Sequence, residues 1–331
     1  MSSYLTSSSL IDTVKREAMI PTSESTFTAS DFLAIANQEM KIGIMPTVME
    51  FHQEYCVVDS DLIPLLPNTN NYAIPYRAVG GKFREVFYKD TNGNLRSLTR
   101  ISPDDRPYYQ QSNFQNRFLY FFIEGNNVVL VPDVGPNPVG SLIFSYYMRP
   151  NELVDESRVS TVLSSSVVGS STILTVDQIP SNLTPFLQGG TTITGFSTSA
   201  KMDILQRQPG HKTLSMDVFP TALDPVNLTI TFNTSDLNAS MVPGDYVAFS
   251  GESIIPQIPT DLHDMLSQRV VHRCVQALGD AQAVQMSGAK LAEMEKHTGF
   301  LIDNRSEGTP QKINNLRGLL RSAKIRKRGW V

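Results

Sequence analysis

The pattern of apolar and polar positions divides the chain into helical ends and a long β-rich middle. Apolar residues recur near every 3.6 positions over 8–19 and 31–57, which predicts an amphipathic helix in each segment. Pro21 ends the first helix, and Ser30 offers an N-cap for the second. Because Gly43 and Pro46 interrupt the second run, we expect two helical pieces or a kink there.

The next segment, residues 62–150, changes to short alternating runs that predict β-strands. Two turns rich in Asn and Gly, at 90–94 and 124–127, tolerate positive φ and predict hairpins. The expected strands are 72–74, 83–88, 95–101, 118–124, 127–131 and 140–149.

Residues 152–255 read as a second β unit that opens with a Ser-rich linker at 157–171. Several short strands at this spacing predict a small sandwich or barrel, inserted as a unit. Its expected strands are 173–176, 191–194, 213–218, 226–232 and 246–249.

From Pro259 the chain turns helical again. Thr260 offers a cap, Gly279 ends the first helix, and Asp280 caps the next, which predicts a helical hairpin. The apolar stripes of the two helices contain Leu262, Leu266, Val270, Cys274, Leu278, Val284, Leu291 and Met294.

The composition excludes some classes of protein but does not indicate a function. The 331 residues are 40% hydrophobic and 18% charged, and no apolar run approaches the roughly 20 residues of a membrane span, so we expect no membrane contact. The N-terminus shows no secretory signal. The two cysteines, Cys56 and Cys274, fall on apolar helix faces, where we expect them to act as small buried side chains.

Charge is distributed unevenly along the chain. From Lys312 to the end there are seven Lys and Arg residues and no acid, so the rest of the chain carries a net charge of −11 within a total of −4. Apolar residues alternate with these charges and Trp330 follows them, which predicts docking into a partner. The predicted docking residues are Lys312, Ile313, Leu316, Arg317, Leu319, Leu320, Arg321, Lys324, Ile325, Arg326, Lys327, Arg328 and Trp330.

Motifs that carry chemistry are missing from the sequence. The five histidines are scattered, and there is no HExxH, no CxxC, no Gly-x-Ser-x-Gly and no phosphate-binding loop. A paired-carboxylate hydrolase stays open, because its carboxylates need no fixed spacing. We therefore predict no enzyme, no cofactor and no catalytic or metal-binding residue.

The order of the predicted helical and β segments resembles that of the head–tail connector or adaptor proteins of tailed phages, in particular those of podoviruses or crAss-like phages. The resemblance rests on the Tyr-Phe-Phe-Ile-Glu-Gly-Asn-Asn-Val-Val-Leu-Val-Pro segment at 120–132 and the Arg-Pro-x-x-Leu exit at 149–153. It continues in Ile-Pro-x-x-Leu-His-x-x-Leu at 258–266 and Ala-Leu-Gly-Asp at 277–280.

The resemblance implies a structural subunit of the virion neck, assembled in the host cytoplasm. Twelve copies would form a homo-oligomeric ring that binds the portal protein and a tail or further neck protein. Genomic DNA would pass through its lumen without sequence-specific binding, and 309–331 would be the portal-docking arm. The ring-core helices would use Phe32, Ile35, Leu262, Leu266, Val270, Leu278, Leu291 and Met294.

Together these observations predict an α+β fold: a helical connector core with a small antiparallel β region, plus an inserted all-β sandwich or barrel domain. The expected boundaries are 1–151 for the N-terminal helices and β region, 152–255 for the inserted domain, 256–308 for the helical hairpin and 309–331 for the basic arm. One alternative is a tail or baseplate protein whose inserted domain binds carbohydrate or a host receptor. Another assigns the basic arm to nucleic acid.

Overall fold

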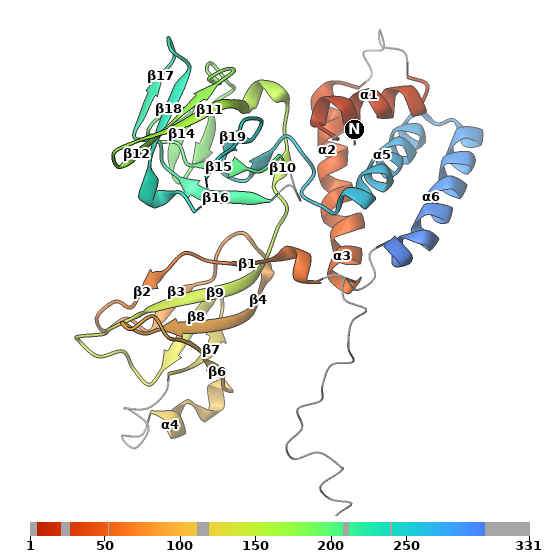
Figure 1. Cartoon of the computed structure of the whole chain (residues 1–331). Helices are drawn as coiled ribbons and strands as arrows, with labels where there is room; N and C mark the ends of the chain where they lie inside the picture. The colour runs from red at the N-terminus through yellow and green to blue at the C-terminus, as the bar shows by residue number, and fades with distance from the viewer. Residues whose placement is uncertain are drawn as a thin grey trace, which may run out of the picture.

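The computed structural model describes residues 5–20, 27–51, 53–110, 119–207, 212–238 and 240–301. Figure 1 shows three units: a helical unit on the right, a first β unit at the lower left and a second β unit at the upper left. The helical unit joins the two ends of the described chain, and the β units lie between them in sequence. The predicted basic arm, 309–331, lies outside the described residues.

The helical unit packs the N-terminal helices against the C-terminal pair around one apolar core. Leu10, Phe32, Ile44, Leu266 and Val270 are almost fully buried there, although they come from segments more than 200 residues apart. Its helices are α1 (Ser7–Glu17), α2 (Ala29–Glu39), a π-helical turn (Met40–Ile44), α3 (Met45–Phe51), α5 (His263–Leu278) and α6 (Ala281–Leu301).

The predicted interruption of the second helix is confirmed as a π-helical turn at Met40–Ile44. Pro46 lacks the N–H that would continue the regular ladder, and a side chain at Gly43 would collide with the Arg269 guanidinium. The predicted end at residue 57 is wrong, because α3 ends at Phe51 and a 3₁₀ turn follows at Gln53–Cys56.

Helix caps show which start signals are used. Thr28, rather than the predicted Ser30, caps α2, in a capping box with Asp31. Asp280 caps α6 as predicted, since its Oδ1 accepts the N–H groups of Gln282 and Ala283. Thr260 makes no side-chain cap, and Gly279 ends α5 at a φ of 77°, a left-handed position that favours glycine.

The first β unit consists of two sheets that share one core. A five-stranded sheet has the order β1-β9-β4-β5, with β2 also on β9, and a four-stranded sheet has the order β3-β8-β7-β6. Both predicted hairpins are confirmed, β4–β5 and β7–β8. The strands are β1 (Val57–Asp59), β2 (Ile63–Pro64), β3 (Asn71–Ala73), β4 (Ala78–Lys89), β5 (Leu95–Ser97), β6 (Thr99–Arg100), β7 (Tyr120–Glu124), β8 (Asn127–Val131) and β9 (Ser141–Met148); the short α4 (Arg106–Tyr109) lies between β6 and β7.

The second β unit is built on one seven-stranded sheet, ordered β16-β15-β19-β11-β12-β18-β17, that curls into a half-barrel. The core of this unit buries Leu174, Met202, Ile230, Phe232 and Phe249. The strands are β11 (Ser160–Val168), β12 (Ser171–Val176), β15 (Met202–Leu205), β16 (Thr213–Val218), β17 (Ala222–Asp224), β18 (Thr229–Asn233) and β19 (Tyr246–Phe249), with a separate hairpin of β13 (Phe186–Gln188) and β14 (Thr191–Ile193).

Two short strands carry the chain between the second β unit and the rest. β10 (Glu152–Leu153) and β20 (Glu252–Ser253) pair in parallel, and the Glu152 N–H donates to the Gly251 carbonyl at 2.8 Å. The entry and exit of the second β unit therefore lie side by side.

The predicted fold class, a helical connector core with a small antiparallel β region and an inserted sandwich or barrel, is wrong. Strands occupy about as large a share as helices, and the β region is a two-sheet unit rather than an appendage. The predicted linker at 157–171 contains β11, because Ser and Val without charges suit a strand that pairs with β12 and β19. The second β unit is a single curled sheet rather than a sandwich.

Candidate functional site at the junction of the three units

The first and second β units meet at a buried arginine. Arg77 lies on the turn before β4, where the Ala78 N–H donates to the Pro75 carbonyl, and its side chain is only 6% exposed. Its guanidinium donates two parallel hydrogen bonds to the Asp203 carboxylate of β15, from Nη1 at 2.7 Å and from Nη2 at 2.8 Å. This fork is a strong, directional form of ion pair, and it links the two units directly.

Asp203 is fully buried, yet its charge is well compensated. Besides Arg77, its carboxylate accepts bonds from the Asn151 side chain at 3.0 Å and from the backbone N–H groups of Asp217 and Gly251 at 3.0 and 2.9 Å. The buried carboxylate therefore has hydrogen-bond donors from three separate segments of the chain besides the guanidinium.

Asp217 of β16 completes the cluster from the solvent side. Its φ of 56° is left-handed, a conformation that aspartate tolerates better than most residues. Its carboxylate accepts bonds from Arg77, the Ser250 hydroxyl and the Tyr76 hydroxyl. Burial pushes its pKa upward, but the Arg77 charge and these hydroxyl bonds outweigh burial, so the pKa of Asp217 lies below its ordinary value.

The remaining titratable groups at the cluster respond mainly to burial. Burial raises the pKa of Tyr76 and raises the pKa of Tyr146 to about 12, so both phenols stay protonated. The Arg77 pKa is raised: burial acts against its charge, but Asp203 and Asp217 overcome that effect. The cluster thus brings one guanidinium together with two carboxylates.

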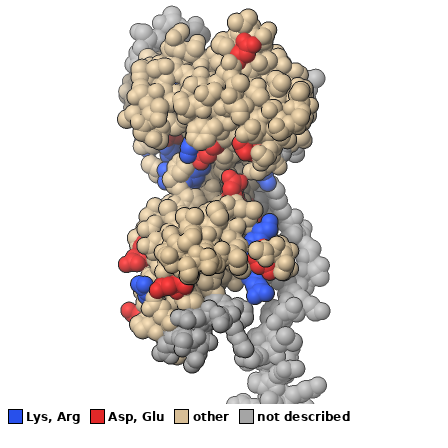
Figure 2. Space-filling view, turned by 90° about the vertical axis from the view of Figure 1, so that its left-hand side faces the viewer, with Lys and Arg blue, Asp and Glu red and all other residues tan. Residues whose placement is uncertain are grey.

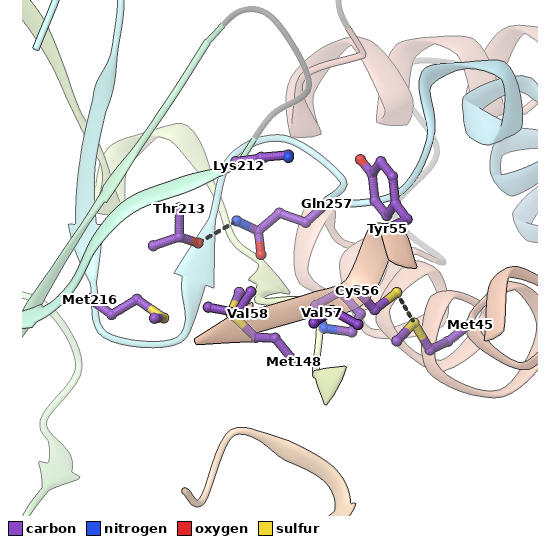
Figure 3. A pocket seen from close by; sticks show the side chains of 11 residues that line it. Met45, Tyr55, Cys56, Val57, Val58, Met148, Lys212, Thr213, Met216 and Gln257 are labelled. Carbon is purple, nitrogen blue, oxygen red and sulfur yellow. Dashed lines mark hydrogen bonds between the residues drawn. The ribbon is translucent and has the colours of Figure 1, made fainter. Parts of the chain in front are cut away.

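A cavity of about 250 Å³ lies beside this cluster, where all three units come together. In Figure 3, Val57 and Val58 of β1 face Thr213 and Met216 of β16 across it, and Gln257 bonds the Thr213 hydroxyl at 2.9 Å. The lining is largely apolar and rich in sulfur; it consists of Met45, Tyr55, Cys56, Val57, Val58, Met148, Pro150, Lys212, Thr213, Met216 and Gln257.

Cys56 is the one thiol in this lining. Its Sγ lies 3.8 Å from the Met45 sulfur, and burial raises its pKa to about 11. The thiol is therefore protonated near neutral pH and serves as a small apolar side chain, as the sequence predicts for Cys56.

A second ion cluster lies inside the helical unit. Glu39 of α2, only 6% exposed, accepts bonds from Arg269 at 3.2 Å and from Arg273 at 2.7 Å, both on α5. Arg269 also reaches Glu295 of α6. The cluster ties α2, α5 and α6 together across the sequence gap.

The predicted ring-core residues mostly contribute to the helical core. Phe32, Leu262, Leu266 and Val270 are buried, and Ile35, Leu291 and Met294 pack against them while partly exposed. The prediction that Leu278 belongs to the helical core is wrong. Leu278 is 45% exposed at the last turn of α5, and it does not belong to the buried apolar cluster.

Sequence reasoning missed Arg77, Asp203 and Asp217 altogether. A usable signal was present for Asp203, a charged residue inside the otherwise apolar strand Met202–Leu205, since such residues are rarely buried without a partner. Nothing in the sequence pairs it with a turn 126 residues earlier.

Comparison of the chain with protein-family models and with curated proteins finds no match. Among the described residues, no group of His, Cys, Asp and Glu side chains could hold a metal ion. None of the described helices is both long and apolar enough to cross a membrane.

Proposed function

We propose that this protein is a structural subunit of the neck of a tailed-phage virion, where copies form a ring that joins the portal to the tail. The observation that carries the proposal is a charge-poor, partly apolar surface on the second β unit. The resemblance of the sequence to phage adaptors narrows the kind of assembly.

Figure 2 shows this surface: the second β unit, at the top, has few charged side chains, and most of them lie near its border with the first β unit below. Several large apolar side chains of this unit are at least half exposed: Leu163, Val167, Val168, Leu187, Val226 and Val242. Exposed apolar residues with few charges are typical of surfaces that contact other proteins. An assembly subunit needs such surfaces.

The β11–β12 hairpin illustrates the point. The residues from Leu163 to Val168 are all exposed, and neither strand contains a charge. Natural proteins usually protect such strands with charge, because uncharged exposed strands aggregate. Cover from a neighbouring subunit would explain why this hairpin has no such protection.

The proposed roles of the parts follow the resemblance. The helical unit would contribute to the ring, with twelve copies in contact, and the genome would pass through the lumen without sequence-specific binding. The basic segment 309–331 would dock on the portal. A tail or further neck protein would bind the side of the ring that faces away from the portal. The protein would act without catalysis and reside in the virion.

The decisive test mixes the purified chain with the portal protein encoded in the same phage genome. We expect negative-stain images to show rings attached to the portal, and a truncation after Leu301 to abolish attachment while leaving the urea unfolding midpoint unchanged. Separate globular particles in both samples would refute the proposal.

The salt dependence of binding distinguishes the competing partners. Binding to the portal should persist between low and moderate salt, whereas binding of the basic segment to duplex DNA through phosphates should fall steeply. Binding of glycans on an array by the full chain, without any portal binding, would instead support the tail or baseplate alternative.

A further inference from the structure

The first β unit is attached to the rest of the molecule at one corner. The chain enters this unit at Val57 and leaves it at Met148, and β1 pairs with β9 so that Val57 lies opposite Tyr147. Two chain crossings side by side form the simplest hinge, because rotation about them stretches neither strand. The short turn Gln53–Cys56 and residues 149–150, which belong to no strand, are the positions that would absorb the rotation.

The second β unit is attached much more firmly. Its connecting strands dock on the helical unit: the Asn37 side chain exchanges two bonds with the Leu153 backbone, at 2.7 and 3.0 Å, and the Ser7 N–H donates to the Ile254 carbonyl at 2.8 Å. Leu153 and Ile258 are buried in the helical core. The helical unit and the second β unit therefore act as one platform.

Beside this corner, where the Arg149 N–H donates to the Arg77 carbonyl at 2.8 Å, polar bonds hold the first β unit to this platform. Tyr76 and Arg77 reach Asp203, Asp217 and Ser250, and the Asn238 amide makes one long contact of 3.5 Å to Asp61. The cavity of about 250 Å³ lies at the same corner, because Val57 and Met148 line it together with Met216, the neighbour of Asp217. Incomplete packing there leaves room for the two units to move relative to each other.

We propose that the first β unit is a pivoting arm, hinged at Val57 and Met148 and held in the observed orientation by an Arg77 latch on Asp203 and Asp217. Because the latch is polar and adjoins a cavity, water can replace its bonds while Val79 and Tyr147 of the arm stay packed against the helical core beside the hinge. The β sheets of the arm keep their own core when it swings. This inference does not depend on the assembly proposed above.

The test measures the distance between the arm and the platform in the full-length chain. Spin labels are attached at Thr91→Cys, in the exposed β4–β5 turn, and at Val226→Cys, which is 89% exposed on the second β unit. The parent chain, whose Cys56 and Cys274 are buried, gives the labelling background. The latch is removed with Arg77→Met together with Asp203→Asn, which leaves no unpaired charge from that pair.

We expect one narrow distance distribution with the latch intact and a distribution at least about twice as broad without it. The matched control, Lys41→Met with Glu152→Gln, removes an ion pair between the helical unit and β10 and should leave the distribution narrow. Hydrogen exchange must show that the amides of β4 and β9 stay protected in both variants.

Two results would overturn the proposal. An unchanged distribution in the latch variant would mean that apolar packing alone orients the arm. A broad distribution with unprotected β4 and β9 amides would mean that the ion cluster is needed for folding of the arm rather than for its orientation.

Discussion

The two joints of this molecule are built on opposite principles. The joint between the N-terminal and C-terminal helices buries a continuous apolar core, and its ion cluster around Glu39 lies at the rim of that core. The joint between the two β units centres on the Arg77 cluster and leaves a cavity beside it. Apolar burial is non-directional and tolerant, whereas a forked ion pair fixes one orientation, so the second joint is the place where small changes act on shape.

Arg77→Met should have the largest effect at either joint. It leaves Asp203 buried with its charge uncompensated by any cation, although three hydrogen-bond donors remain, and loss of one partner of a buried pair typically costs about 3–5 kcal/mol. Urea unfolding monitored by circular dichroism gives the free energy. The double variant with Asp203→Asn should recover much of the loss; equal losses would contradict the role assigned to the buried charge.

At the helical joint, Leu266→Ala should rank next. The side chain is fully buried between the two halves of the helical core, and such truncations cost about 2–5 kcal/mol through lost burial and the cavity that remains. The same urea measurement applies. Leu278→Ala on the same helix serves as the control and should be nearly neutral, because Leu278 is 45% exposed.

The pH dependence of stability should report on the joint between the two β units. Folding lowers the pKa of Asp217, so its ionised form adds stability that is fully present above about pH 4 and lost as the pH falls below that value. Asp217→Asn should flatten this acid limb of the stability curve. A variant with the same acid limb as the parent would show that other carboxylates cause it.

The smallest effect is expected at the surface. Lys41→Met removes an ion pair with Glu152 whose partners are both substantially exposed, and such pairs contribute at most about 1 kcal/mol. Its unfolding midpoint should shift little. A loss as large as that of Arg77→Met would refute the ranking of buried over exposed pairs.

Much of the local structure followed from sequence patterns. The 3.6-residue periodicity located α1, α2 and α5, Gly279 and Asp280 marked the boundary between α5 and α6, and the Asn-Gly turns located both hairpins of the first β unit. These features depend on neighbours within a few residues, so a single sequence contains them. The chain segment 160–168 was misread because Ser and Val suit linkers and strands alike.

What the tertiary structure decided is how the pieces pair. Seven strands curl into one sheet because β11 joins β19 on one side and β12 on the other, and no local pattern encodes that choice. Arg77 meets Asp203 only because the β3–β4 turn comes to rest against β15. Such contacts depend on packing between segments far apart in the sequence. Local periodicity therefore does not indicate which residues meet at the junction of the units.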